Sequence, residues 1–141
     1  PSAEGVFRKM IEEHESFDGS IYIDSCGTHS YHIGQSPDVR AQHAAVNRGI
    51  DISKQMARQI EADDFDFFDY ILVMDNFNLN MVHSMVDETY RSKIHLFLDY
   101  AELNEYKEVP DPYYGGEGGF EIVLDLLEQA SIGLIKHLQS N

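Results

Sequence analysis

The feature that most constrains the fold is a regular alternation of helix-type and strand-type segments along the chain. Five segments are predicted helices, from apolar spacing or from capping residues, at residues 1–14, 36–49, 51–65, 76–86 and 120–139. Three short runs rich in β-branched and aromatic residues lie among them and are predicted strands, at residues 19–25, 68–75 and 93–100. The pattern therefore predicts one α/β domain over residues 1–141, with a parallel sheet covered by helices on both faces.

The chain begins on a helix rather than on a strand. Pro1 suits the first helical turn, and Val6, Phe7, Met10 and Ile11 follow at helical spacing. A doubly wound sheet normally begins with a strand, and its ligands often bind in the loop between the first strand and the first helix. We therefore expect that strand and that loop to be absent from the 141 residues.

Charge and cysteine content exclude several classes of partner. Ten Lys and Arg against 25 Asp and Glu give a net charge of −15, which repels nucleic acid and anionic membranes. No apolar run approaches the ~20 residues of a membrane span. The single cysteine, Cys26, cannot form an internal disulfide and fits a reducing compartment, so we expect a cytoplasmic protein. The seven histidines are scattered, and neither a metal site nor a cofactor is expected.

The segment VPDPYYGG, residues 109–116, carries the clearest signal for chemistry. Asp111 lies between two prolines, which stiffen the main chain around it, and two tyrosines follow. A carboxyl group on a rigid loop beside aromatic rings suits general-acid work, because partial desolvation raises its pKa toward the working range. The alternative is a solvated turn, since Asp and Pro are common turn residues.

Six stretches in a fixed order resemble the low-molecular-weight protein tyrosine phosphatases. They are PSAEGVF, DSCGTHSYHIGQSPDVR, RGIDIS, ARQI, DFDFFDYILVMDNFNL, and VPDPYYGG with the helix that follows it. The resemblance implies a three-layer, doubly wound α/β fold with a four-stranded parallel sheet. It also implies hydrolysis of phosphotyrosine through a cysteinyl-phosphate, without a cofactor. The expected partners are a tyrosine-phosphorylated protein or a small aryl phosphate, and phosphate or another oxyanion.

The resemblance also assigns roles to particular residues. Asp111 matches the acid that protonates the departing phenolate and later activates water. Tyr31, Tyr113 and Tyr114 match aromatic positions at the substrate cleft. The motif MDNFN contributes Asp75 and Asn78, which match positions that support the phosphate-binding loop, although helix capping explains them equally well.

The nucleophile and the phosphate-binding arginine of this family lie in a Cys-x5-Arg-Ser loop. In the family that loop runs directly into the segment matched by Pro1, so both residues are expected to lie outside the 141 residues. Cys26 does not replace the nucleophile, because His32 stands where the arginine is required. We therefore expect the 141-residue chain alone to be inactive.

Two other functions remain open at this point. The chain could be a catalytically inactive, truncated homologue that serves as a binding module. Loss of a central strand would then leave its neighbours ~10 Å apart with unpaired edges, unless another segment filled the gap. The chain could also be an oxyanion reductase like the arsenate reductases of this fold, although their thiol relay needs more than one cysteine. A monomer or a weak dimer is expected.

Overall fold

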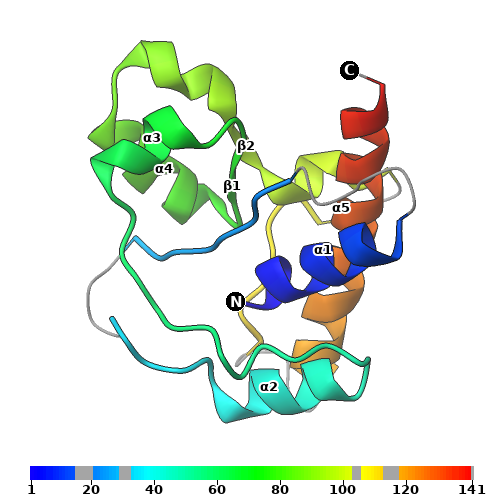
Figure 1. Cartoon of the computed structure of the whole chain (residues 1–141). Coiled ribbons are helices and arrows are strands. Elements are labelled where there is room, and N and C mark those ends of the chain that lie inside the picture. Colours follow the sequence, from blue (N-terminus) through cyan, green and yellow to red (C-terminus); the bar gives the residue numbers. More distant parts are fainter. Residues whose placement is uncertain (15–20, 29–32, 103–105, 113–117, 141) are drawn as a thin grey trace.

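The computed structural model describes residues 1–14, 21–28, 33–102, 106–112 and 118–140 (Figure 1). Five α-helices, two short strands and two 3-10 helices follow one another in these residues. They are α1 (Ser2–Glu13), α2 (Val39–Val46), α3 (Ala62–Phe67), β1 (Ile71–Val73), α4 (Asn76–Met85), η1 (Glu88–Lys93), β2 (Ile94–Leu96), η2 (Phe97–Tyr100) and α5 (Gly119–Gln139).

The two strands form a parallel pair. Ile71 lies opposite Ile94, and Val73 lies opposite Leu96. Their order along the chain, with α4 and η1 between them, is that of a parallel crossover unit. The predicted α/β class with a parallel sheet is thereby confirmed, whereas the described residues form a sheet of two strands rather than four.

The residues of β1, and Met74 directly after it, alternate between two apolar clusters. Leu72 and Met74 pack against the cluster that α1 and α5 dominate. Ile71 and Val73 belong to the cluster formed with Phe65. This alternation follows from the two-residue period of a strand and gives both faces of β1 an apolar cover.

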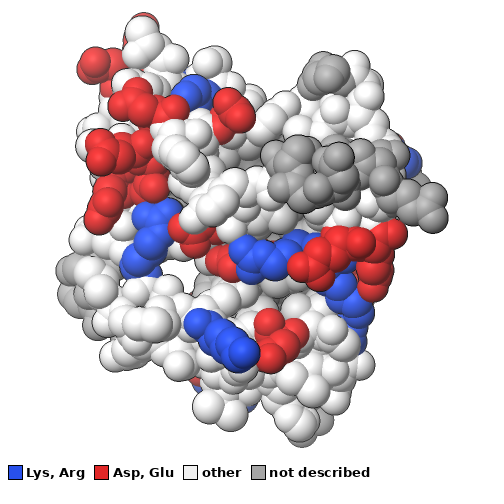
Figure 2. Space-filling model, in the orientation of Figure 1, with Lys and Arg blue, Asp and Glu red and all other residues white. Residues whose placement is uncertain are grey.

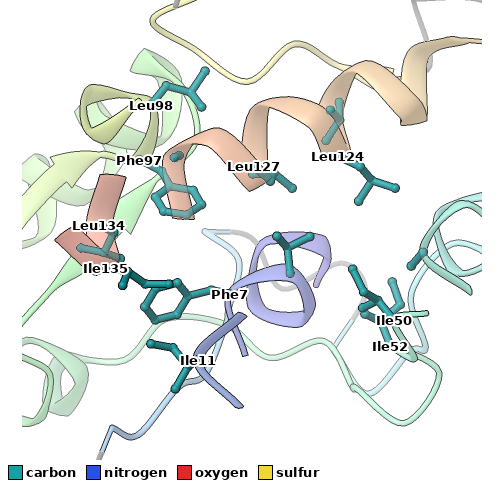
Figure 3. Close-up of a cluster of buried hydrophobic side chains, with 14 of the residues drawn as sticks. Phe7, Ile11, Ile50, Ile52, Phe97, Leu98, Leu124, Leu127, Leu134 and Ile135 are labelled. Carbon is teal, nitrogen blue, oxygen red and sulfur yellow. The ribbon is translucent and has the colours of Figure 1, made fainter. Parts of the chain in front are cut away.

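The larger apolar core lies between α1 and α5 (Figure 3). Phe7 and Ile11 project from α1 toward Leu127, Leu134 and Ile135 of α5, and all five side chains are buried. The apolar spacing predicted for both helices is confirmed. Packing in this core therefore fixes the position of α1. The N-terminal end of α1 borders the candidate site.

The predicted strand at residues 19–25 was wrong within its described part. Residues 21–26 have no assigned strand, and the segment forms a single parallel bridge where Gly27 pairs with Gln59. The reason is physical, since an extended segment becomes part of a sheet only when a neighbouring strand supplies hydrogen bonds.

The predicted helix over residues 51–65 was wrong in its first eleven positions, because α3 begins at Ala62. The main chain of residues 57–60 is hydrogen-bonded to the segment at 27–35 instead. Ala57 N donates to Gln35 O at 2.8 Å, and Ile60 N donates to Gly27 O at 2.9 Å. Those bonds occupy groups that a helix would need.

The predicted strand at 93–100 was also too long. Residues 94–96 form β2, and residues 97–100 form η2. Phe97 and Leu98 are buried against the α1–α5 core, so tertiary packing overrides the β-propensity of this apolar run.

Candidate functional site

Two cavities meet at the N-terminal end of α1. The larger has a volume of about 530 Å³, and its lining includes Pro1, Glu4, Cys26 and Asn78. The smaller, of about 260 Å³, is lined by Pro1 and Pro112 among others. The start of α1 thus lies between the loop that contains Asp111 and the beginning of α4.

The loop that carries Asp111 is anchored before and after this residue. Glu108 accepts a hydrogen bond from Asn76 N at 2.7 Å, and Val109 N donates to Met74 O at 2.8 Å. These bonds tie the loop to the end of β1 and the first turn of α4. Asp111 itself is exposed.

The other anchor is a close approach between the loop and α5. A Cβ atom added to Gly119 would lie 2.1 Å from the carbonyl oxygen of Pro112. Only glycine lets the main chain of α5 approach this closely. The prolines and these anchors together limit the positions that Asp111 can take.

The two residues of interest in the MDNFN motif, Asp75 and Asn78, have different surroundings. Asp75 is the N-cap of α4, and its side chain accepts a hydrogen bond from Asn78 N at 2.7 Å. The capping interpretation of Asp75 is thereby confirmed. Asn78 is half-buried and lines the larger cavity, so its side chain has access to that space.

The aromatic positions predicted for the cleft lie outside the described residues. They are Tyr31, Tyr113 and Tyr114. Their assignment to the substrate cleft stays a prediction.

Cys26 lines the larger cavity but has the wrong electrostatics for a nucleophile at neutral pH. Desolvation raises the pKa of its thiol to about 11, and the carboxylates of Asp64 and Asp24 add to this effect while Arg58 opposes it. A phosphatase nucleophile must be a thiolate near neutral pH. The expectation that Cys26 does not replace the nucleophile is supported by this environment.

A polar network that sequence reasoning missed fixes the segment at residues 21–25 to α1. Glu4 is buried, and its carboxylate accepts hydrogen bonds from Ser25 Oγ and from Arg8. Arg8 also donates to Ile23 O at 2.7 Å. The spacing of Glu4 and Arg8, four residues apart on a helix, predicts their ion pair, but no sequence signal identifies Ser25 as the third partner.

Arg58 is a second residue whose role the sequence did not indicate. Its guanidinium forms two hydrogen bonds to Asp64, at 2.9 and 3.1 Å, and one to Asp24 at 3.1 Å. It therefore joins the extended segment to α3 along the wall of the larger cavity. Such a bidentate pair is geometrically specific.

Two further arginines, Arg48 and Arg40, form ion pairs at helices. Arg48 pairs with three carboxylates of α5, those of Glu121, Asp125 and Glu128. Arg40 pairs with Asp38, the N-cap of α2.

Acidic side chains dominate the surface over α3 (Figure 2). No group of three or more potential metal ligands occurs in the described part of the chain. In the same residues, no helix combines the length and the apolar character that a membrane span needs. The negative field of this surface disfavours approach of polyanions.

Comparison with known proteins gives one consistent result. The model of the family "Low molecular weight phosphotyrosine protein phosphatase" matches residues 1–141. A protein of that name from Schizosaccharomyces pombe is 42% identical over 120 residues, which are 85% of this chain and 76% of the relative. The low molecular weight protein-tyrosine-phosphatase YfkJ of Bacillus subtilis is 36% identical over 99% of this chain and 87% of its own.

Solved structures agree with the sequence relatives. A crystal structure of a protein tyrosine phosphatase from Entamoeba histolytica, with Hepes in its active site, matches with a TM-score of 0.93. The two chains are 40% identical, and the match covers 99% of this chain and 88% of that one. From the family model and these relatives, the chain belongs to the low molecular weight phosphotyrosine protein phosphatase family.

Proposed function

We propose that this chain supplies the acid, the cleft and the scaffold of a phosphotyrosine phosphatase that works through a cysteinyl-phosphate, with Asp111 as general acid and base. The observation that carries the proposal is the anchoring of the Asp111 loop to the end of β1 and to α5, beside the start of α1. A carboxyl group held at one side of a helix N-terminus can face an anion bound there.

The first chemical step transfers the phosphoryl group. A thiolate attacks phosphorus, an S–P bond forms, and the bond between phosphorus and the phenolic oxygen breaks. Asp111 gives its proton to that oxygen, so the product leaves as a neutral phenol rather than as a phenolate. General-acid assistance of this kind contributes about 10²- to 10⁴-fold to rate.

The second step returns the enzyme to its starting state. Asp111, now a carboxylate, removes a proton from water while the water oxygen attacks phosphorus. The S–P bond breaks, and inorganic phosphate and the thiolate are released. Asp111 ends the cycle protonated, so one residue acts as acid and then as base.

Asn78 and the cleft aromatics are assigned supporting roles. Asn78, which lines the cavity beside α1, supports the phosphate-binding loop by hydrogen bonding, whereas Asp75 acts on that loop through the cap of α4. Tyr31, Tyr113 and Tyr114 contact the aryl group of the substrate. The thiolate and the arginine of the Cys-x5-Arg-Ser motif are not among the 141 residues, in which the single Cys26 is followed six positions on by His32.

The test uses a chimera, because the unaltered chain is predicted to be inactive. The part of the E. histolytica relative that contains its Cys-x5-Arg-Ser loop is joined to Pro1, and hydrolysis of p-nitrophenyl phosphate is measured. The chimera is expected to be active, and Asp111→Asn is expected to lower kcat by at least about 100-fold. The loss is expected to be larger for phenols that leave poorly.

Matched variants separate the acid role from a general loss of charge. Asp99→Asn removes another exposed carboxylate and is expected to leave kcat unchanged, as is Cys26→Ser. Equal kcat for Asp111→Asn and the parent would remove Asp111 from the acid role. Turnover by the unaltered chain would contradict the assigned need for the loop. An inactive chimera that binds a phosphotyrosine peptide would favour the binding module, and thiol-dependent reduction of arsenate would favour the reductase.

A further inference from the structure

Helix α4 differs from the other described α-helices because it contains no Lys, Arg, Asp or Glu. Its sequence is NFNLNMVHSM, whereas charged residues make up 25% of the whole chain. The helix lies on the opposite side of the two strands from α5 (Figure 1). A surface helix normally turns a charged or polar face to water, so the outward side of α4 is unusual in a chain with a net charge of −15.

An apolar row runs along this outward side. Its members are Phe77, Met81 and Met85, which are four residues apart and therefore lie on one side of the helix. Phe77 is 61% exposed and Met85 is 46% exposed, while Met81 is half-buried. The inward side of α4 serves the core, because Val82 is buried in the cluster formed with Phe65. The row of Phe77, Met81 and Met85, called the α4 row below, is thus a second apolar side of the same helix.

The α4 row begins beside the loop that carries Asp111. Asn76 N, in the same helical turn as Phe77, donates to Glu108 at 2.7 Å, and Glu108 lies three residues before Asp111. Residues next to a phosphotyrosine held against Asp111 would therefore lie close to the first turn of α4. From that turn the row extends along ~12 Å of helix, which about four residues of extended chain would cover.

We propose that the α4 row is a docking surface for apolar residues that flank the phosphotyrosine of a substrate protein. The inference rests on the proposed function and names its substrate class, which is phosphotyrosine segments with apolar neighbours. Apolar side chains are stabilised when contact with the row removes them from water, and the flexible methionine side chains adapt to neighbours of different shape. The negative field of the chain disfavours an acidic segment, and α4 has no carboxylate that could pair with a basic one.

Other occupants fit the α4 row less well. A second copy of the chain would bring two net charges of −15 together, which repel each other. Three side chains also cannot supply the ~800 Å² per partner of a standard protein–protein interface. A substrate segment needs neither, because it is already held at the phosphotyrosine and the row continues directly from the acid-bearing loop.

Methyl NMR on the 141-residue chain tests the docking without any chemical step. The chain contains five methionines, of which Met81 and Met85 belong to the row, whereas Met56 is 68% exposed outside it. The probe is a peptide with leucines at alternate positions on both sides of an unphosphorylated tyrosine. The methyl signals of Met81 and Met85 are expected to shift saturably, and that of Met56 is expected to stay. The matched peptide with serine in place of each leucine is expected to shift none of them.

Kinetics of the chimera described above test the effect on specificity. The substrates are the phosphotyrosine forms of the same two peptides, with p-nitrophenyl phosphate as a reference that has no flanking residues. The parent is expected to favour the leucine peptide by at least about tenfold in kcat/KM, through a lower KM.

Matched variants locate this preference. Phe77→Ser combined with Met85→Ser is expected to reduce it to less than about threefold, while the conservative Phe77→Leu is expected to retain it. Ile132→Ser removes an apolar side chain that is 39% exposed on α5, and it is also expected to retain the preference.

Several results would overturn the inference. Unshifted Met81 and Met85 signals, an equal shift of Met56, or equal preference in the parent and the double variant would each do so. Row signals that change with protein concentration in the absence of peptide would identify a second copy as the occupant. A chimera that hydrolyses p-nitrophenyl phosphate but does not favour the leucine peptide refutes this inference alone. A chimera without any activity refutes the proposed function, and the methyl signals then decide the docking.

Discussion

The environment of Cys26 predicts that its thiol reacts unusually slowly with alkylating agents. With a pKa of about 11 in place of the ordinary ~8.5, the thiolate fraction at about pH 7.5 falls roughly 300-fold. The more basic thiolate is the better nucleophile, with a Brønsted coefficient of about 0.4–0.5, which offsets about a factor of 10. Folded chain is therefore expected to react with iodoacetamide about 30-fold more slowly than an ordinary thiol.

The measurement is unambiguous because the chain contains one cysteine. Alkylation is followed by intact mass across the pH range, with the same chain in concentrated urea as the reference. The rate for folded chain is expected to rise about tenfold per pH unit up to about pH 10, without the plateau that an ordinary thiol shows above its pKa of ~8.5. The reference in urea is expected to show that plateau.

A charge variant tests the cause of the shift. The carboxylate of Asp24 raises the pKa of Cys26, so Asp24→Asn is expected to lower that pKa and to speed alkylation at neutral pH. A rate that levels off near neutral pH, or equal rates in folded and unfolded chain, would refute the reasoning. Cys26 would then have the thiolate character of a nucleophile, and its exclusion from catalysis would fail.

Three further predictions concern stability and are checked by urea unfolding. A Cβ atom added at Gly133 would lie 1.6 Å from Tyr100 O, so Gly133→Ala is expected to destabilise the fold by at least about 2 kcal/mol. Nothing lies within 4 Å of a Cβ atom added at Gly118, so Gly118→Ala is expected to destabilise it by less than about 1 kcal/mol. Ser131 is fully buried and its hydroxyl has no hydrogen-bond partner among the described residues, so Ser131→Ala is expected to stabilise by about 1 kcal/mol, and a loss would contradict the geometry. Burial alone would raise the pKa of Asp64, but hydrogen bonds from Arg58 and from the main chain of Glu61 lower it. The stabilisation of the fold by the Asp64 carboxylate is therefore complete above the ordinary pKa of ~3.9 and is lost as the pH falls through the lowered value. The stability of Asp64→Asn is expected to depend less on pH in this acid range, and an equal dependence in variant and parent would refute the argument.

Local sequence patterns predicted the elements that depend on their own residues. The apolar spacing of α1 and α5 identifies two helices that pack together, because each presents an apolar stripe. The cap of α4 at Asp75 was also readable, since its carboxylate and the third residue of the helix are close along the chain. The alternating order of elements was sufficient for the α/β class.

Patterns were insufficient where main-chain groups are satisfied by distant segments. Residues 57–60 lie in a segment that the sequence predicts to be helical, yet their hydrogen bonds go to residues 27–35. Residues 21–25 have strand-type composition, yet they lie beside a cavity and form no ladder. In both segments the partner, not the local propensity, determines the conformation.

The candidate site shows the same division. The sequence by itself singled out Asp111 as a candidate, from its two flanking prolines and the following tyrosines, and placed the chain in its family through six ordered motifs. Only the tertiary structure joined Glu4 to Ser25, Arg58 to Asp24, and the Asp111 loop to the end of β1. Each of these contacts links residues far apart along the chain, and their meeting depends on how helices and extended segments pack, which no short motif encodes.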